Sequence, residues 1–152
     1  MAKHLLQQNR QPRTSDQKAQ TRIASRCQIV EYLKAGHKCQ KELGIEKRTA
    51  DRIVKGNPVQ PTEENQCYVK CLYQTFGIID EEGDFLPDVA RLKVPKPLGR
   101  FKDLANDWVD ECQYEEGEDM CEKAYNIWHC FVRLKTKNQQ EIIKKLTNSH
   151  LL

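Results

Sequence analysis

Residues 112–130 read CQYEEGEDMCEKAYNIWHC, and their three cysteines are separated by two gaps of eight residues each. From Asp119 onward the stretch has the pattern of a helix, which would carry Cys121 and Cys130. Positions nine residues apart in a helix are separated by about two and a half turns, so these two thiols face roughly opposite sides. Such a helix offers one thiol to each of two neighbouring helices. The spacing therefore indicates a helical domain in which one helix is fastened on both sides.

The rest of the chain also has a helical pattern. Apolar and polar residues show no sustained alternation of the kind that indicates strands, and no Asn-Gly or Asp-Gly hairpin turn occurs. The sequence predicts an all-α domain of six to seven short helices. Glycine, proline and capping residues place these helices at 14–43, 45–56, 62–76, 88–93, 98–114 and 119–135, with a last amphipathic stretch at 139–152.

We expect three parts along the chain: a flexible basic arm at 1–14, a helical ligand-binding domain at 15–135, and a C-terminal helix or tail at 136–152. Residues 1–26 carry six lysines and arginines against one acid, Asp16, whereas the formal net charge of the whole chain is only +3. The residues after 26 therefore carry a net charge of 3 − 5 = −2 and are mildly acidic. This distribution argues against nucleic acid as a partner.

Seven cysteines in 152 residues are typical of an oxidising compartment. The first residues, MAKHLLQQNRQPRTSDQKAQ, lack the apolar run of about 7–15 residues that a secretory signal needs. Either a leader has been removed, or the protein is cytosolic and its thiols are reduced. No stretch approaches the roughly 20 apolar residues of a transmembrane helix. We expect a secreted, extracellular protein.

Three roles compete for the cysteines. Structural zinc needs ligand pairs two to four residues apart, and only Cys67 and Cys71 have that spacing, while the histidines do not complete a set. A catalytic cysteine needs a base within reach, and His129 adjoins Cys130 only in sequence. Three disulfides with one thiol left over are the third role. Physical reasoning from the sequence does not choose among the many possible pairings.

Without Cys27, the cysteine pattern resembles that of a known family. It reads Cys39-x27-Cys67-x3-Cys71-x40-Cys112-x8-Cys121-x8-Cys130. This is similar to the six-cysteine signature of the insect odorant-binding proteins, the carriers of pheromones and general odorants. The segments RIVKG, CYVKCLYQTFGIIDEEGDF, WVDEC and CEKAYNIWHC also fit. The resemblance covers about Cys27 to Leu134.

The resemblance implies a pairing and an architecture. In the family the first cysteine joins the third, the second the fifth and the fourth the sixth, which here would give Cys39–Cys71, Cys67–Cys121 and Cys112–Cys130. Each bridge is expected to stabilise the fold by about 2–4 kcal/mol. The resemblance also implies that the helices surround an internal apolar cavity instead of a solid core.

Apolar side chains that lie away from the cysteines are the candidates for lining that cavity. They recur at helical spacing, so plain core packing is the alternative for each of them. Tyr73, Trp108 and Trp128 would add a hydrogen-bond donor to an apolar body. The candidate ligand-binding residues are Ile53, Val54, Val69, Leu72, Tyr73, Phe76, Leu104, Trp108, Ala124, Trp128, Phe131 and Leu134.

What the resemblance implies is carriage, not catalysis. We expect a secreted carrier that binds a small hydrophobic molecule, such as an odorant, a pheromone or a similar semiochemical, and transports it through aqueous lymph. No metal, cofactor or catalytic residue is expected, since no constellation such as the His-Asp site and calcium loop of a secreted phospholipase occurs. An odorant receptor or a membrane surface would be a further partner. The alternatives are a non-sensory carrier or scavenger of lipids or hormones, and a secreted interaction or host-defence module that acts through the basic arm.

Cys27 departs from the family pattern as a seventh cysteine. An odd cysteine in a secreted protein indicates either an intermolecular disulfide, and so a homodimer, or a free thiol. Burial beside Ile23 and Val30 on one helix face is the other interpretation. The basic arm departs in a second way, since it is longer than the few residues expected there. The C-terminal segment is expected to differ among such proteins, and here it is long enough to lie across the mouth of a pocket or to insert its apolar side.

Overall fold

The computed structural model describes residues 15–93 and 101–150, with side-chain surroundings from residue 29 onward except at 101–103 and at several positions after 141. The predicted basic arm, the helix start at 98 and the surroundings of Cys27 lie outside these described residues. Six helices follow one another along the described chain, and the only strand-like pairing there is an isolated bridge between Ile79 and Phe85. The prediction of an all-α fold is confirmed. The helices are α1 (Ser15–Leu43), α2 (Lys47–Val54), α3 (Glu63–Phe76), α4 (Pro87–Lys93), α5 (Phe101–Cys112) and α6 (Met120–His150).

Helix α3 lies at the centre of the fold, and its two ends follow from local sequence. At its start the Thr62 hydroxyl accepts a hydrogen bond from the Asn65 backbone N–H at 3.2 Å, which satisfies one of the free donors of the first turn. At its end Gly77 adopts φ 92°, a left-handed conformation that glycine adopts without strain, and its N–H bonds back to Tyr73 and Gln74. Both ends are where the sequence predicts them.

The core forms where α1 and α6 pack against α3. Tyr68, Val69 and Leu72 are completely buried on α3, and the Tyr68 hydroxyl donates a hydrogen bond to the backbone oxygen of Gly36 on α1 at 2.8 Å. Gly36 is needed for this close approach. A Cβ there would lie 2.8 Å from Cγ2 of Val54 and 3.3 Å from the Tyr68 hydroxyl.

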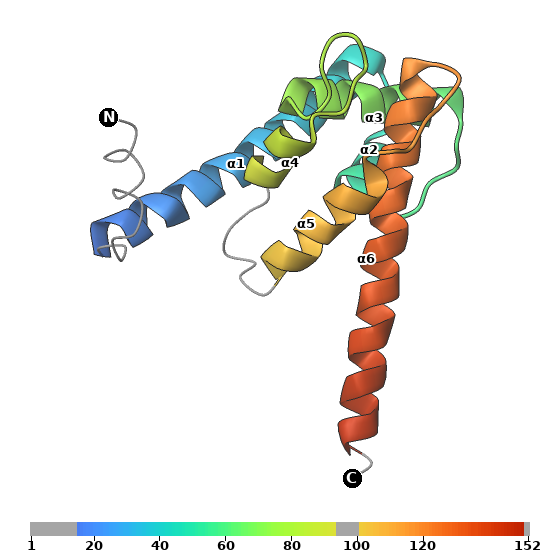
Figure 1. The fold of residues 1–152 in the computed structure, drawn as a ribbon. Coiled ribbons are helices and arrows are strands. Elements are labelled where there is room, and N and C mark those ends of the chain that lie inside the picture. The colour runs from blue at the N-terminus through green and yellow to red at the C-terminus, as the bar shows by residue number, and fades with distance from the viewer. Residues whose placement is uncertain (1–14, 94–100, 151–152) are drawn as a thin grey trace, which may run out of the picture.

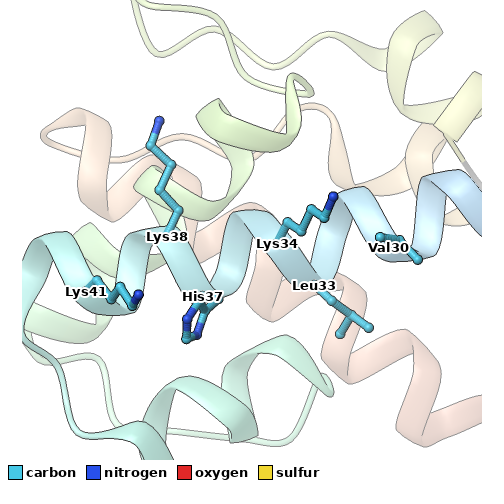
Figure 2. A pocket seen from close by; sticks show the side chains of 6 residues that line it. All are labelled: Val30, Leu33, Lys34, His37, Lys38 and Lys41. Carbon is cyan, nitrogen blue, oxygen red and sulfur yellow. The ribbon is translucent and has the colours of Figure 1, made fainter.

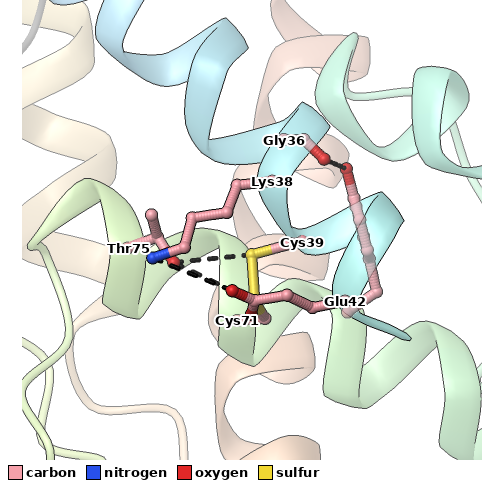
Figure 3. Close-up of a disulfide and its surroundings, with 7 residues drawn as sticks. Gly36, Lys38, Cys39, Glu42, Cys71 and Thr75 are labelled. Atoms are coloured by element: carbon pink, nitrogen blue, oxygen red, sulfur yellow. Dashed lines mark hydrogen bonds and ion pairs between the residues drawn. A yellow bond between two sulfur atoms is a disulfide. The ribbon is translucent and has the colours of Figure 1, made fainter. Parts of the chain in front are cut away.

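Three disulfides hold the helices together, with the pairing that the family resemblance implies. Cys39–Cys71 joins α1 to α3, Cys67–Cys121 joins α3 to α6, and Cys112–Cys130 joins α5 to α6. Figure 3 shows the first of these between α1 and α3, beside Thr75, whose hydroxyl lies 3.4 Å from the Cys39 sulfur. Helix α6 is therefore fastened on two sides, as the spacing of Cys121 and Cys130 predicts. Because all six cysteines are oxidised, neither zinc ligation nor a catalytic thiolate is available to them.

The C-terminal stretch continues α6 and does not form a separate element. The sequence predicts an end near 135 and a new segment from 139, but one helix runs without a break to His150. Beyond Lys135 it projects away from the other helices, in a direction different from that of the N-terminal half of α1 (Figure 1). Most of the described side chains after 135 are exposed. In this structure the segment does not lie across the core.

Candidate ligand pocket

A pocket of about 170 Å³ opens where five helices meet. Helix α6 contributes one wall, with three apolar side chains and a lysine, and α1, α2, α3 and α5 supply the others. Five of the lining residues are aromatic and two more are valines. The complete lining consists of Tyr32, Val54, Lys55, Gly56, Tyr73, Trp108, Trp128, Phe131, Val132 and Lys135.

The rim of the pocket is the C-terminal end of α2, where the last carbonyls of a helix lack partners within the helix. Three successive carbonyls here receive donors from other helices. Trp128 Nε1 donates to the oxygen of Ile53 at 3.1 Å, the Tyr32 hydroxyl to that of Val54 at 3.3 Å, and Lys135 Nζ to that of Lys55 at 2.9 Å. Side chains of α1 and α6 thus hold this edge of the pocket in place.

Two of the lining residues carry hydrogen-bonding groups that no described part of the protein engages. Neither the Tyr73 hydroxyl nor Trp108 Nε1 makes a hydrogen bond to any part of the chain that the structure describes. Burial raises the pKa of Tyr73 well above its usual value, because the phenolate would lose its hydration. Tyr73 therefore remains a neutral hydroxyl over the physiological pH range, able to donate to or accept from a ligand.

Five of the twelve residues predicted from the sequence line this pocket. They come from four helices and are Val54, Tyr73, Trp108, Trp128 and Phe131. Five others lie in the buried core, namely Ile53, Val69, Leu72, Phe76 and Ala124. The remaining two, Leu104 and Leu134, are half-buried and outside the lining. Of the three residues expected to donate a hydrogen bond to a ligand, Trp128 already donates to the backbone oxygen of Ile53.

Sequence reasoning missed Tyr32, Lys55, Gly56, Val132 and Lys135. For two of these residues the sequence does contain a signal, which is their spacing along α6. Val132 lies four positions after Trp128, and Lys135 four positions after Phe131, so both continue the face of α6 that the prediction identified. Tyr32 carries none, since nothing in the sequence shows how α1 crosses the other helices.

A second, larger hollow of about 520 Å³ runs along the surface of α1. All of its described lining residues belong to that helix, namely Val30, Leu33, Lys34, His37, Lys38 and Lys41. Figure 2 shows Lys38 and Leu33 pointing to opposite sides of the helix. A surface built on one helix cannot surround a small ligand on several sides, as binding pockets do. The aromatic pocket is therefore the better candidate.

Two other kinds of site find no support in the described part of the chain. No group of three or more histidines, cysteines or acids there is arranged to hold a metal ion. None of the described helices is both long and apolar enough to cross a bilayer.

Comparisons with known proteins agree with the fold and with the family resemblance. General odorant-binding protein 69a of Drosophila melanogaster is 26% identical over 110 residues, which is 72% of each chain. Odorant-binding protein 10 of Aedes aegypti is 26% identical over 102 residues, which is 65% of this chain and 69% of that one.

Solved structures share the fold. The odorant-binding protein dmelOBP28a from Drosophila melanogaster superposes with a TM-score of 0.64 at 21% identity, covering 76% of this chain and 98% of that one. The fatty acid binding protein OBP56a from the oral disk of the blowfly Phormia regina superposes with a TM-score of 0.53 at 20% identity, covering 84% and 98%. Residues 15–133 match the PBP/GOBP family, and they include all six paired cysteines. With this match over most of its length, the chain belongs to the PBP/GOBP family of insect odorant-binding proteins.

Proposed function

We propose that this protein is a secreted carrier that takes up one small hydrophobic molecule in the aromatic pocket and transports it through an aqueous secretion. The PBP/GOBP family consists of non-enzymatic proteins that bind small hydrophobic ligands. The observation that carries the proposal for this chain is the pocket itself. Aromatic residues of α1, α3, α5 and α6 line it together, and the hydroxyl of one of them, Tyr73, has no described hydrogen-bond partner.

The driving force is the removal of apolar surface from water. Each Å² of apolar surface that leaves water contributes about 25 cal/mol. Micromolar affinity corresponds to about −8 kcal/mol, so a few hundred Å² are sufficient even after the costs of association. A pocket of about 170 Å³ is smaller than most binding sites, which measure roughly 300–1,000 Å³. It suits a compact volatile or a short-chain amphiphile better than a long lipid.

Secretion is part of the proposal because of the disulfides. Three intramolecular bridges persist in oxidising surroundings and are rare where glutathione keeps thiols reduced. Transport through a secretion also explains why the pocket residues are held by cross-linked helices. A carrier has to keep its binding site in dilute solution without help from a partner.

The test is a titration of the oxidised protein with the apolar fluorophore N-phenyl-1-naphthylamine. We expect saturation near one probe per chain, blue-shifted emission, and displacement by small volatiles. Trp108→Ala should weaken binding, because Trp108 lines the pocket, whereas Tyr114→Ala should not, because Tyr114 is an exposed aromatic outside it. The absence of saturable binding, or equal effects of the two substitutions, would contradict the proposal.

A further inference from the structure

Two lysines lie at the edge of the aromatic pocket. Lys135 of α6 and Lys55, the residue that follows α2, both belong to its lining, and no acidic side chain is found among the described lining residues. Lys135 is half-buried and passes close to Gly56, where a Cβ would be 3.2 Å from its Nζ. Its head group is thereby held beside the apolar walls.

Neither lysine has a carboxylate partner in the described part of the structure, unlike several other lysines of the chain. Lys38 pairs with Glu42, Lys93 with Glu31, and Lys123 with both Asp84 and Glu116. The described contact of the Lys135 ammonium is its hydrogen bond to the backbone oxygen of Lys55. An ammonium has three N–H donors, so two of them are not used in this contact.

We propose that the pocket selects a short amphiphile with an anionic head group, a carboxylate in the simplest case. The apolar chain would lie among Tyr73, Trp108 and Phe131, and the head group would bind Lys135 with support from Lys55. This inference rests on the proposed carrier function and adds the chemical class of the ligand. Hydrogen bonds between charged partners are about twice as strong as neutral ones, and next to apolar walls they are weakly screened.

The competing account is that Lys135 acts only as a cap for α2. A cation at the C-terminal end of a helix is favoured by the helix dipole, and Lys135 does occupy that place. The two accounts predict different things for ligands. A cap stabilises the rim and so affects charged and neutral ligands alike, whereas a head-group site distinguishes a carboxylate from an alcohol of the same length.

The experiment compares octanoic acid with octan-1-ol as competitors for the fluorescent probe at pH 7 and low ionic strength. In the wild type we expect octanoate to bind about tenfold more tightly than octanol. Lys135→Met should abolish this ratio, because octanoate loses its head-group partner as well as the rim contact, whereas octanol is affected only by the loss of the rim contact. The matched control is Lys137→Met, because Lys137 is an exposed lysine of the same helix outside the lining, and it should preserve the ratio.

A second readout needs no variant. Raising the salt concentration from 20 to 500 mM should weaken octanoate binding severalfold and leave octanol binding unchanged. Equal affinities of acid and alcohol in the wild type, or an equal loss of both in Lys135→Met, would overturn the head-group site and leave the carrier function standing. If neither compound nor the probe binds, the carrier function itself is wrong.

Discussion

The indole Nε1 of Trp128 on α6 donates a hydrogen bond to the backbone oxygen of Ile53 on α2, at 3.1 Å and across 75 residues of sequence. The contact is buried, and the neighbouring carbonyls of Val54 and Lys55 are held in the same way from α1 and α6. The edge of the pocket is thus fixed by contacts between helices that are far apart in the chain. We infer that the pocket is organised before a ligand enters.

Trp128→Phe tests this organisation. The Ile53 oxygen keeps its bond from the Gly56 N–H, so loss of the indole bond should cost about 1 kcal/mol, with a further loss from the smaller ring. We also expect weaker probe binding, because α2 is held less firmly. Chemical denaturation and the probe titration measure the two effects. Trp108→Phe is the control, since Trp108 Nε1 donates no hydrogen bond to the described protein. Equal losses of stability in the two variants would contradict this role of Trp128.

Gly36→Ala on α1 should narrow the pocket by displacing the side chain of Val54. The added methyl would lie 2.8 Å from Cγ2 of Val54, which lines the pocket, and would push that side chain towards it. Overpacking costs about 1–3 kcal/mol and the better helix propensity of alanine returns about 1 kcal/mol, so a modest net destabilisation is expected. Probe affinity should fall severalfold, and the double variant Gly36→Ala/Val54→Ala should recover part of it. If the single variant is more stable and its probe affinity is unchanged, the prediction is wrong, because α1 then moves to accommodate the added methyl.

The three disulfides should differ in their contribution to stability. Cys67–Cys121 spans 54 residues and Cys112–Cys130 spans 18, so chain entropy predicts that the first stabilises the fold by about 1 kcal/mol more. Paired replacement of each bridge by alanines, followed by urea denaturation, measures the difference. If loss of Cys112–Cys130 costs more than loss of Cys67–Cys121, native-state packing around α5 outweighs loop closure.

Stability should fall at alkaline pH because of a buried tyrosine. Burial, helped by the nearby carboxylate of Asp51, raises the pKa of Tyr68 to about 12. In the unfolded chain a tyrosine ionises near pH 10. The folded protein therefore binds this proton more tightly, so the contribution of Tyr68 is complete below about pH 10 and is lost as the pH rises to about 12.

Urea midpoints at pH 9, 10.5 and 11.5 measure this loss. In Tyr68→Phe, which has no ionisable hydroxyl at this position, the fall should be smaller than in the wild type. Tyr32 and Tyr73 account for part of the remainder, since burial raises the pKa of each in the same direction. Identical pH profiles for the two proteins would contradict the prediction.

Much of the fold could be predicted from the sequence, because it depends on local signals. Thr62 and Gly77 mark the ends of α3, and the spacing of Cys121 and Cys130 indicates a helix fastened on two sides. The pairing itself came from the family resemblance, since spacing alone leaves it open. The unbroken course of α6 was missed because residues 135–139, KTKNQ, are polar and interrupt the apolar pattern without ending the helix.

The pocket was only partly predictable, for a different reason. Apolar stripes show which helix faces are buried but not which residues lie at the edge of a hollow, so Val69 and Leu72 could not be separated from Tyr73. The sequence shows that Lys135 continues the face of Phe131 on α6, but not that it lies at the end of α2. Its position depends on how α6 crosses the end of α2, and this crossing is set by tertiary packing.

The most direct test of the carrier account is the location of a bound ligand. Nuclear Overhauser contacts between ¹³C-labelled octan-1-ol and the protein would provide it, since a neutral ligand reports on the pocket independently of the lysines. We predict contacts to the rings of Tyr73, Trp108 and Phe131, which come from three different helices around one pocket. Contacts confined to Val30 and Leu33 on the outer face of α1 would contradict the account.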